Sequence, residues 1–205
     1  MRIIFATTNE GKMKEIREIL GDLGLQILSL KEAGIDVMVD ENGSTFEENA
    51  LIKAREIAKL CPNDLILADD SGLEIDALNK EPGIYSARYL GEDTPYDEKN
   101  RIILDRMSSF EGKERSARFV CAIAAIIPNK GKEMVCRATF EGEIANQSVG
   151  DNGFGYDPIF WVPSLQCTSA ELSMEEKNRR SHRGQALRAM KRNMEECLHA
   201  ISDRK

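Results

Sequence analysis

The stretch Leu65-Ile66-Leu67-Ala68-Asp69-Asp70-Ser71-Gly72 joins four apolar residues to two adjacent acids. Four consecutive apolar residues indicate a short buried strand. Adjacent carboxylates repel each other, so the pair costs stability unless a cation or hydrogen-bond donors compensate it. Ser71 and Gly72 predict a sharp turn at the end of that strand, where the backbone can approach a ligand closely. The pattern favours a site that holds a hard divalent metal and activates water, although a solvated turn has the same pattern.

Strands and helices are expected on both sides of this stretch. Apolar runs predict strands over residues 2–6, 25–30 and 73–75, and helical spacing predicts helices over 13–20, 45–60, 95–107 and 182–201. Strands over 117–127 and 133–144 are expected to pair through a hairpin turn at 129–131. Three glycines predict a loop over 150–156. The mixed pattern predicts an α/β fold with a mixed central sheet and flanking helices, in a single domain over 1–205.

Composition narrows the class of protein. The 205 residues are 41% hydrophobic and 31% charged, with a net charge of −7, as expected for a globular protein in water. The acidic balance argues against nonspecific nucleic-acid binding. No apolar run approaches the roughly 20 residues of a membrane span. The apolar run at the start of the sequence is too short for a signal peptide. The five dispersed cysteines fit reduced thiols. We therefore expect a cytoplasmic protein without nucleic-acid or membrane partners.

A polar segment, Thr7-Thr8-Asn9-Glu10-Gly11-Lys12, lies between the first strand and the first helix. A helix N-terminus offers free N–H groups and a partial positive charge to an anion. The two hydroxyls and the ammonium add donors, and the glycine lets backbone amides approach. The spacing is not that of a Walker A loop. The segment fits a phosphate cradle, and it fits equally a plain helix cap with the asparagine at the N-cap.

Further acids precede the helix at 45–60. Asp40 and Glu41, together with Asp69 and Asp70, offer hard oxygen ligands. Mg²⁺ usually takes one or two carboxylates and keeps waters or phosphate oxygens in its other positions. The sequence leaves open which of the four acids bind a metal.

Two segments late in the chain suggest a pocket for a planar ligand. Phe154 lies between glycines, where it can stack on a nucleobase, and Asp157 precedes a proline that keeps it extended. Ser181 is a candidate N-cap for the last helix. His182 and Arg183 then fall in the first helical turn, where cations are disfavoured, which suggests a compensating anion or an aromatic ligand. The alternatives are a packed aromatic and a solvated basic face.

Six segments in this order resemble the inosine triphosphate pyrophosphatase family, the noncanonical purine NTP pyrophosphatases. They are Ala6-Thr7-Thr8-Asn9-Glu10-Gly11-Lys12, Thr45-Phe46-Glu47-Glu48-Asn49-Ala50, Ala68-Asp69-Asp70-Ser71-Gly72-Leu73, Pro82-Gly83-Ile84-Tyr85-Ser86-Ala87-Arg88, Gly153-Phe154-Gly155-Tyr156-Asp157-Pro158 and Ser181-His182-Arg183-Gly184-Gln185-Ala186-Leu187. The chain departs from the family at Thr8, where Gly is usual, and at Asn42, where an acid or Thr is usual. The resemblance implies an elongated, two-lobed α/β fold with a cleft between the lobes, usually as a homodimer. It also implies Mg²⁺-dependent hydrolysis of ITP, dITP, XTP and dXTP to the monophosphate and pyrophosphate, which cleanses the nucleotide pool.

The resemblance also implies roles for individual residues. Glu41 and Asp70 are similar to the metal carboxylates, and Asp70 is similar to the general base. The implied substrate contacts are Thr7, Thr8, Asn9, Glu10, Gly11, Lys12, Lys53, Ser71 and Lys177, with a base pocket of Phe154, Gly155, Tyr156, Asp157, His182 and Arg183. Arg183 and backbone amides near Phe154 are candidate donors to the C6 carbonyl of hypoxanthine and xanthine.

Two other functions fit the same residues. One is a pyrophosphatase for other modified nucleotides, such as pyrimidine triphosphates, with the same chemistry and a different base pocket. The other is a nucleotide sensor that binds triphosphate without turnover. The acids Glu41, Asp69 and Asp70 favour an enzyme over a sensor, because a pure binder needs no carboxylates beside phosphate.

Overall fold

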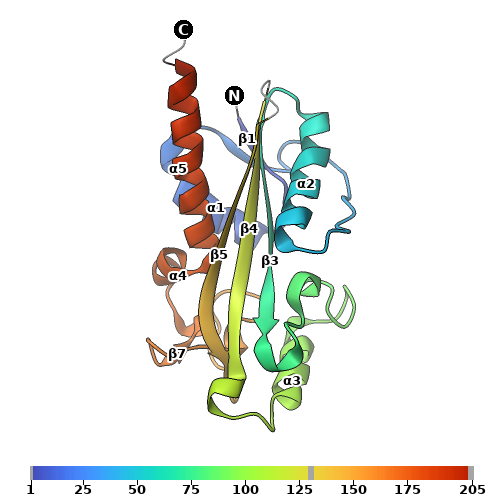
Figure 1. Ribbon diagram of the computed structural model, residues 1–205, viewed down its shortest axis with the longest axis vertical. Helices are drawn as coiled ribbons and strands as arrows, with labels where there is room; N and C mark the ends of the chain where they lie inside the picture. The colour runs from blue at the N-terminus through green and yellow to red at the C-terminus, as the bar shows by residue number, and fades with distance from the viewer. Residues whose placement is uncertain (1, 129–131, 203–205) are drawn as a thin grey trace. The chain divides into compact units, whose positions relative to one another are not determined.

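The computed structural model describes residues 2–128 and 132–202, which form an α/β fold (Figure 1). The strands are β1 (Ile3–Phe5), β2 (Ile27–Ser29), β3 (Leu65–Ile75), β4 (Ser116–Ile127), β5 (Lys132–Ile144), β6 (Phe160–Val162) and β7 (Cys167–Thr168). The helices are α1 (Glu10–Leu20), α2 (Phe46–Leu60), α3 (Tyr96–Arg106), α4 (Met174–Arg180) and α5 (His182–Ser202). The predicted hairpin turn at 129–131 lies outside the described residues. No helix in the described part of the chain is both long enough and apolar enough for a membrane span.

The described strands form one seven-stranded sheet in the order β2-β1-β3-β4-β5-β6-β7. β1 pairs in parallel with both β2 and β3, whereas β6 pairs antiparallel with β5 and β7. The predicted mixed sheet with flanking helices is therefore confirmed.

The chain divides into two compact units. The first comprises Met1–Asp70, Cys121–Ala138 and Arg183–Lys205, and the second comprises Ser71–Val120 and Thr139–His182. Strands β3, β4 and β5 contribute residues to both units. The single domain and the cleft between two lobes stay predictions.

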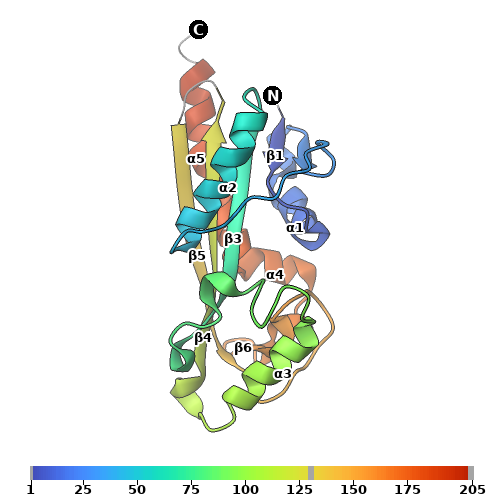
Figure 2. The same ribbon diagram turned by 90° about the vertical axis from the view of Figure 1, so that its right-hand side faces the viewer.

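In the first unit, α2 and α5 cover opposite faces of the strands (Figures 1 and 2). On one face, buried residues of β1 and β3 pack against α1 and α5. Those residues include Phe5, Leu65, Leu67, Met13, Ile16, Leu187 and Met190. Each such side chain contributes about 1.5–3 kcal/mol by leaving water, which fixes both helices on the sheet.

β3 is 11 residues long and runs through the acid pair without a break, so the predicted turn after Asp70 is wrong. Successive side chains of a strand point to opposite faces. Asp69 therefore lies on the face of Leu65 and Leu67, which α1 and α5 cover, and Asp70 lies on the face toward α2. The two carboxylates thus point away from each other, and the strand needs no solvated turn to separate their charges.

Helices α1 and α2 each begin directly after a capping residue. Asn9 caps α1 through its side chain, which accepts a hydrogen bond from the Lys12 amide at 3.0 Å. Thr45 caps α2 in the same way, with the Glu48 amide as donor. Helix α4, which begins at the N-cap Ser173, was not predicted from the sequence. Ser181 is the C-cap of α4 and directly precedes α5, which is the position expected of the N-cap of the last helix.

The second unit has its own apolar core. It gathers side chains of β3, α3, β4 and the segment that ends in β6. Among them are Leu73, Ile75, Ile103, Phe119, Ile159 and Phe160. The loop with three glycines at 150–156 is confirmed, and it leads into this core through the buried Tyr156 and Ile159.

Candidate active site

Asp69 is a buried anion surrounded by cations. Its carboxylate oxygens lie 3.0 Å and 2.9 Å from Lys12 Nζ, and Arg183 Nε lies 3.4 Å from Oδ2. Lys53 Nζ donates to the backbone carbonyl of the same residue at 3.0 Å. Burial opposes the charged form, but these cations outweigh it and hold the pKa of Asp69 well below its usual range. Asp69 is therefore ionised at neutral pH and fixes the positions of the cations around it.

Asp70 has a different environment. Its side chain is 8% exposed and accepts a hydrogen bond from Asn49 Nδ2 at 3.1 Å. Burial raises the pKa of Asp70 to about 6, Lys53 opposes this shift, and the charge of Glu41 adds to it. A carboxylate with a pKa close to neutrality suits a general base, because it is ionised at pH 7 and still binds a proton well.

Lys53 links Glu41 to the acid pair. Its Nζ lies 2.7 Å from Glu41 Oε1. Burial lowers the pKa of Lys53, but Asp69 and Glu41 raise it, and the net shift is upward. The ammonium is thus held charged between acids from two segments of the first unit.

The donor set around Asp70 fits a hard divalent cation. Glu41 and Asp70 lie close enough for the charge of one to raise the pKa of the other. Two carboxylates with further positions for water or phosphate oxygens are the usual protein share of a Mg²⁺ site. Among the described residues, no group of three or more His, Cys, Asp or Glu side chains could hold a metal by itself.

The start of α1 presents an exposed polar surface in the same unit. Thr7 is buried and accepts from the Asn9 amide at 3.2 Å, whereas residues 8–11 are exposed. The first amides of a helix have no acceptor within the helix, so those of Glu10 and Gly11 can bind an anion. Lys12 lies in this first turn and is bound to Asp69, so the expected cradle and the acid pair occur together. Asn9 acts as the helix cap at the same time.

Arg183 is buried at the start of α5. Its Nη1 lies 2.6 Å from Glu15 Oε2, in addition to the contact of Nε with Asp69. Burial opposes its charge, but both carboxylates keep the pKa of Arg183 above its usual value. The anion expected near this unfavourably placed cation is therefore protein carboxylate. A contact of Arg183 with a nucleobase stays a prediction.

Asp157 organises the aromatic loop in the second unit. Its Oδ2 accepts from the Phe154 amide at 2.9 Å and from Lys177 Nζ at 2.6 Å, and its Oδ1 accepts from Ser169 Oγ at 2.9 Å. Lys177 Nζ also lies 4.9 Å from the centre of the Phe154 ring. The Phe154 amide, expected as a donor to a base, is thus already bound, while the ring itself is 36% exposed.

The remaining predicted site residues of the second unit lie in different surroundings. Tyr156 is buried, and its hydroxyl donates to the Ser86 carbonyl at 2.7 Å. The His182 ring is buried and stacks on Phe119, with ring centroids 4.9 Å apart. Ser71 is half-buried in β3. Their contacts with a substrate stay predictions.

Two residues that bind the central side chains were not predicted from the sequence. They are Asn49, on Asp70, and Glu15, on Arg183. Both are polar residues at buried positions of amphipathic helices. Asn49 follows Phe46 by three positions and so shares its apolar face, which is a signal that the sequence does contain.

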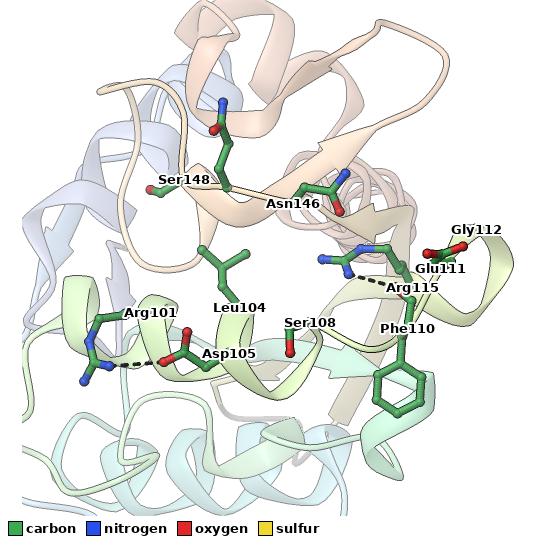
Figure 3. A pocket seen from close by; sticks show the side chains of 11 residues that line it. Arg101, Leu104, Asp105, Ser108, Phe110, Glu111, Gly112, Arg115, Asn146 and Ser148 are labelled. Atoms are coloured by element: carbon green, nitrogen blue, oxygen red, sulfur yellow. Dashed lines mark hydrogen bonds and ion pairs between the residues drawn. The ribbon is translucent and has the colours of Figure 1, made fainter.

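A cavity of about 660 Å³ lies in the second unit, and one residue of its wall, Arg115, joins two chain segments (Figure 3). Its lining includes none of the predicted site residues. Arg115 in its wall is buried and donates to four backbone carbonyls at 2.6–3.0 Å. The acceptors are Met107 and Phe110, after α3, and Ile144 and Ala145, at the end of β5. Arg115 therefore ties these two chain segments together.

The Arg115→Met variant is expected to lose about 2 kcal/mol of unfolding free energy, because it leaves carbonyls without their donor. The matched control is Arg101→Met in the wall of the same cavity, where an exposed pair with Asp105 contributes less than about 1 kcal/mol. Urea unfolding measures both. Equal midpoints for the two variants would contradict the role given to Arg115.

Comparison with known proteins identifies the family. A model of the Ham1 family matches residues 3–193. The chain belongs to the Ham1 family. A Ham1 relative from Clostridium perfringens (strain 13 / Type A), named dITP/XTP pyrophosphatase, is 46% identical over 202 residues, which is 96% of this chain and 98% of that protein. One from Exiguobacterium sibiricum has the same name and is 46% identical over 190 residues, or 93% of this chain and 95% of that protein.

Solved Ham1 structures have the same fold. A HAM1 protein from Coxiella burnetii superposes with a TM-score of 0.86 at 43% identity, covering 96% of this chain and 99% of that chain. The Ham1 protein of Staphylococcus aureus superposes with a TM-score of 0.84 at 42% identity, covering 95% of this chain and 98% of that chain. The family expected from the six motifs and the α/β fold are therefore both confirmed.

Proposed function

We propose that this chain hydrolyses dITP, ITP, XTP and dXTP to the nucleoside monophosphate and pyrophosphate. Its Ham1 membership and the relatives named dITP/XTP pyrophosphatase support the reaction class. The observation that carries the proposal is the buried Asp69-Asp70 pair, with Lys12 and Lys53 bound against it. Carboxylates of unequal pKa beside fixed cations and exposed helix amides suit a metal-bound polyphosphate.

Binding of the triphosphate is assigned to the start of α1. Asp69 holds the Lys12 ammonium in the first helical turn, next to the exposed Glu10 and Gly11 amides. The ammonium and the amides then stabilise charge that collects on phosphate oxygens, without reorganising during the reaction. Thr7, Thr8 and Asn9 complete the proposed cradle.

Asp70 is assigned as the general base. A bond forms between a water oxygen and the α-phosphorus, the bond from that phosphorus to the oxygen bridging the α- and β-phosphates breaks, and pyrophosphate leaves. The water proton passes to the Asp70 carboxylate. Asn49 holds that carboxylate in one orientation, which favours a fixed position for the attacking water.

Glu41 and Asp70 are the residues that would hold Mg²⁺. When bound there, the ion would offset phosphate charge and lower the pKa of a bound water. Lys53, between Glu41 and the acid pair, holds these groups in place and contributes a further positive charge toward the substrate.

Base selection is assigned to the second unit and Arg183. The exposed Phe154 ring offers a face for stacking on a purine. Hypoxanthine and xanthine carry a carbonyl at C6 where adenine carries an amino group, so a donor aimed at C6 accepts the former and rejects the latter. Lys177, His182 and Arg183 carry such N–H groups. The family resemblance also supports a homodimer in the cytoplasm.

With Mg²⁺ present, kcat/KM for ITP and XTP is expected to exceed that for ATP by about fivefold or more, since a mismatched polar edge costs at least about 1 kcal/mol. Pyrophosphate release from ITP, XTP, GTP, ATP and modified pyrimidine triphosphates measures this. Equal values for ATP and ITP would remove the proposed selectivity. Binding of ITP without release of pyrophosphate would instead support a sensor.

A further inference from the structure

The direction of the Phe154 ring is not fixed by its own segment of backbone. Both neighbours are glycines in the left-handed region, with φ of +80° at Gly153 and +71° at Gly155. Glycine enters and leaves this region without steric cost. The backbone can therefore rotate on both sides of the aromatic residue, and contacts with other side chains must hold the ring in place.

One outside contact comes from helix α3. Asn100 Nδ2 donates to the Gly155 carbonyl at 3.0 Å. The opposite amide orientation would bring two oxygens together, so the carbonyl decides which side-chain atom faces it. On the other side of Phe154, Asp157 binds the Phe154 amide. The Phe154 amide and the Gly155 carbonyl, at the two ends of this dipeptide, are thus held by different side chains.

The rest of the loop has separate anchors. The Tyr156 hydroxyl binds the Ser86 carbonyl, and its ring meets the Tyr96 ring edge-on at 5.2 Å between centroids. These contacts do not involve Asn100. Loss of the Asn100 bond would therefore release the Gly155 carbonyl, at the end of the Phe154-Gly155 dipeptide, while Tyr156 stays in the core.

Stability does not explain Asn100. The residue is 3% exposed, and its Oδ1 accepts no hydrogen bond from the described part of the chain. A buried acceptor without a donor costs about 1–3 kcal/mol, about as much as its one hydrogen bond returns. An apolar side chain of similar size would remove the unpaired acceptor and the hydrogen bond to Gly155 together, with little net change in stability. A buried amide whose oxygen has no hydrogen-bond donor therefore needs an explanation other than stability.

We infer that Asn100 is a positioning residue for base selection: by holding the Gly155 carbonyl, it sets the Phe154 ring against the purine. This inference rests on the proposed function. If rotation at Gly153 and Gly155 changed the direction of the Phe154 ring, water could still attack the α-phosphorus. The ring would bind the purine less well and discriminate less between bases.

The test compares Asn100→Leu, which removes the donor, with Asn100→Asp, which places a carboxylate oxygen against the carbonyl. Glu98→Gln, at an exposed position of the same helix, is the matched control. Both Asn100 variants are expected to raise KM for ITP about tenfold to a hundredfold, the cost of misplacing a bound group by about 1 Å, and to lower the ITP/ATP preference. The kcat for ITP and the hydrolysis of ribose 5′-triphosphate, which lacks a base, should change less than about threefold, within the scatter expected of a change that misses the reacting atoms.

The outcomes separate the two proposals. An unaltered chain that releases no pyrophosphate from ITP overturns the proposed function. An active chain whose Asn100 variants keep the ITP/ATP ratio, or lose ITP and ribose 5′-triphosphate hydrolysis equally, overturns only the role of Asn100. Failure of both variants to fold also overturns it, because the half-satisfied amide predicts that Asn100→Leu unfolds no more easily than Glu98→Gln.

Discussion

The Asp70→Asn variant is expected to release pyrophosphate from ITP at least about a hundredfold more slowly than the unaltered chain. Asparagine has nearly the same shape, and its carbonyl can still accept from Asn49. It cannot take up a proton at neutral pH, and it removes one of the two proposed metal carboxylates. Steady-state rates at saturating Mg²⁺ and ITP measure the loss.

Thermal unfolding distinguishes this loss from damage to the fold. Burial raises the pKa of Asp70 to about 6, so the folded chain favours the neutral form of this side chain more than the unfolded chain does. At pH 7 the ionised carboxylate therefore costs stability, and Asp70→Asn is expected to melt at the same temperature or higher. Asp97→Asn, at an exposed position, is the control for the same chemical change. A variant at position 70 with near-normal turnover contradicts the role of Asp70.

The second large effect is expected at Arg183. Arg183→Met leaves the buried Asp69 and Glu15 without their shared cation. Removing one partner of a buried ion pair costs about 3–5 kcal/mol, because a buried charge remains uncompensated. For a chain of this size the melting temperature falls by about 10 °C.

A second substitution tests the cause of that loss. Arg183→Met combined with Glu15→Leu removes one stranded carboxylate, so the double variant should be more stable than Arg183→Met alone. Arg101→Met breaks an exposed pair with Asp105 and should cost less than about 1 kcal/mol. Equal melting temperatures for Arg183→Met and the Arg101→Met control would contradict the role given to Arg183.

Local patterns in the sequence predicted most elements of the fold because their causes are local. Asn9 and Thr45 cap the helices that follow them, and apolar runs predicted β4, β5 and the two ends of β3. The short α4 was missed, because no helix was predicted over residues 174–180. Its own signal, Ser173 followed by Glu176, is a local cap that the structure confirms.

The error at the acid pair has a different origin. Asp69 and Asp70 followed by Ser and Gly suggest a turn when only neighbours in the chain are considered. The compensating groups are distant: Lys12 is 57 positions from Asp69, and Arg183 is 114 positions away. Local spacing carries no record of such contacts, so the motifs indicated which residues matter but not which of them bind one another.

Hydrolysis of ITP in ¹⁸O-labelled water tests the central claim most directly. If water activated at Asp70 attacks the α-phosphorus, one labelled oxygen enters each inosine monophosphate and none enters the pyrophosphate, as mass spectrometry of the two products will show. Label in pyrophosphate, or release of inorganic phosphate as the first product, would contradict it.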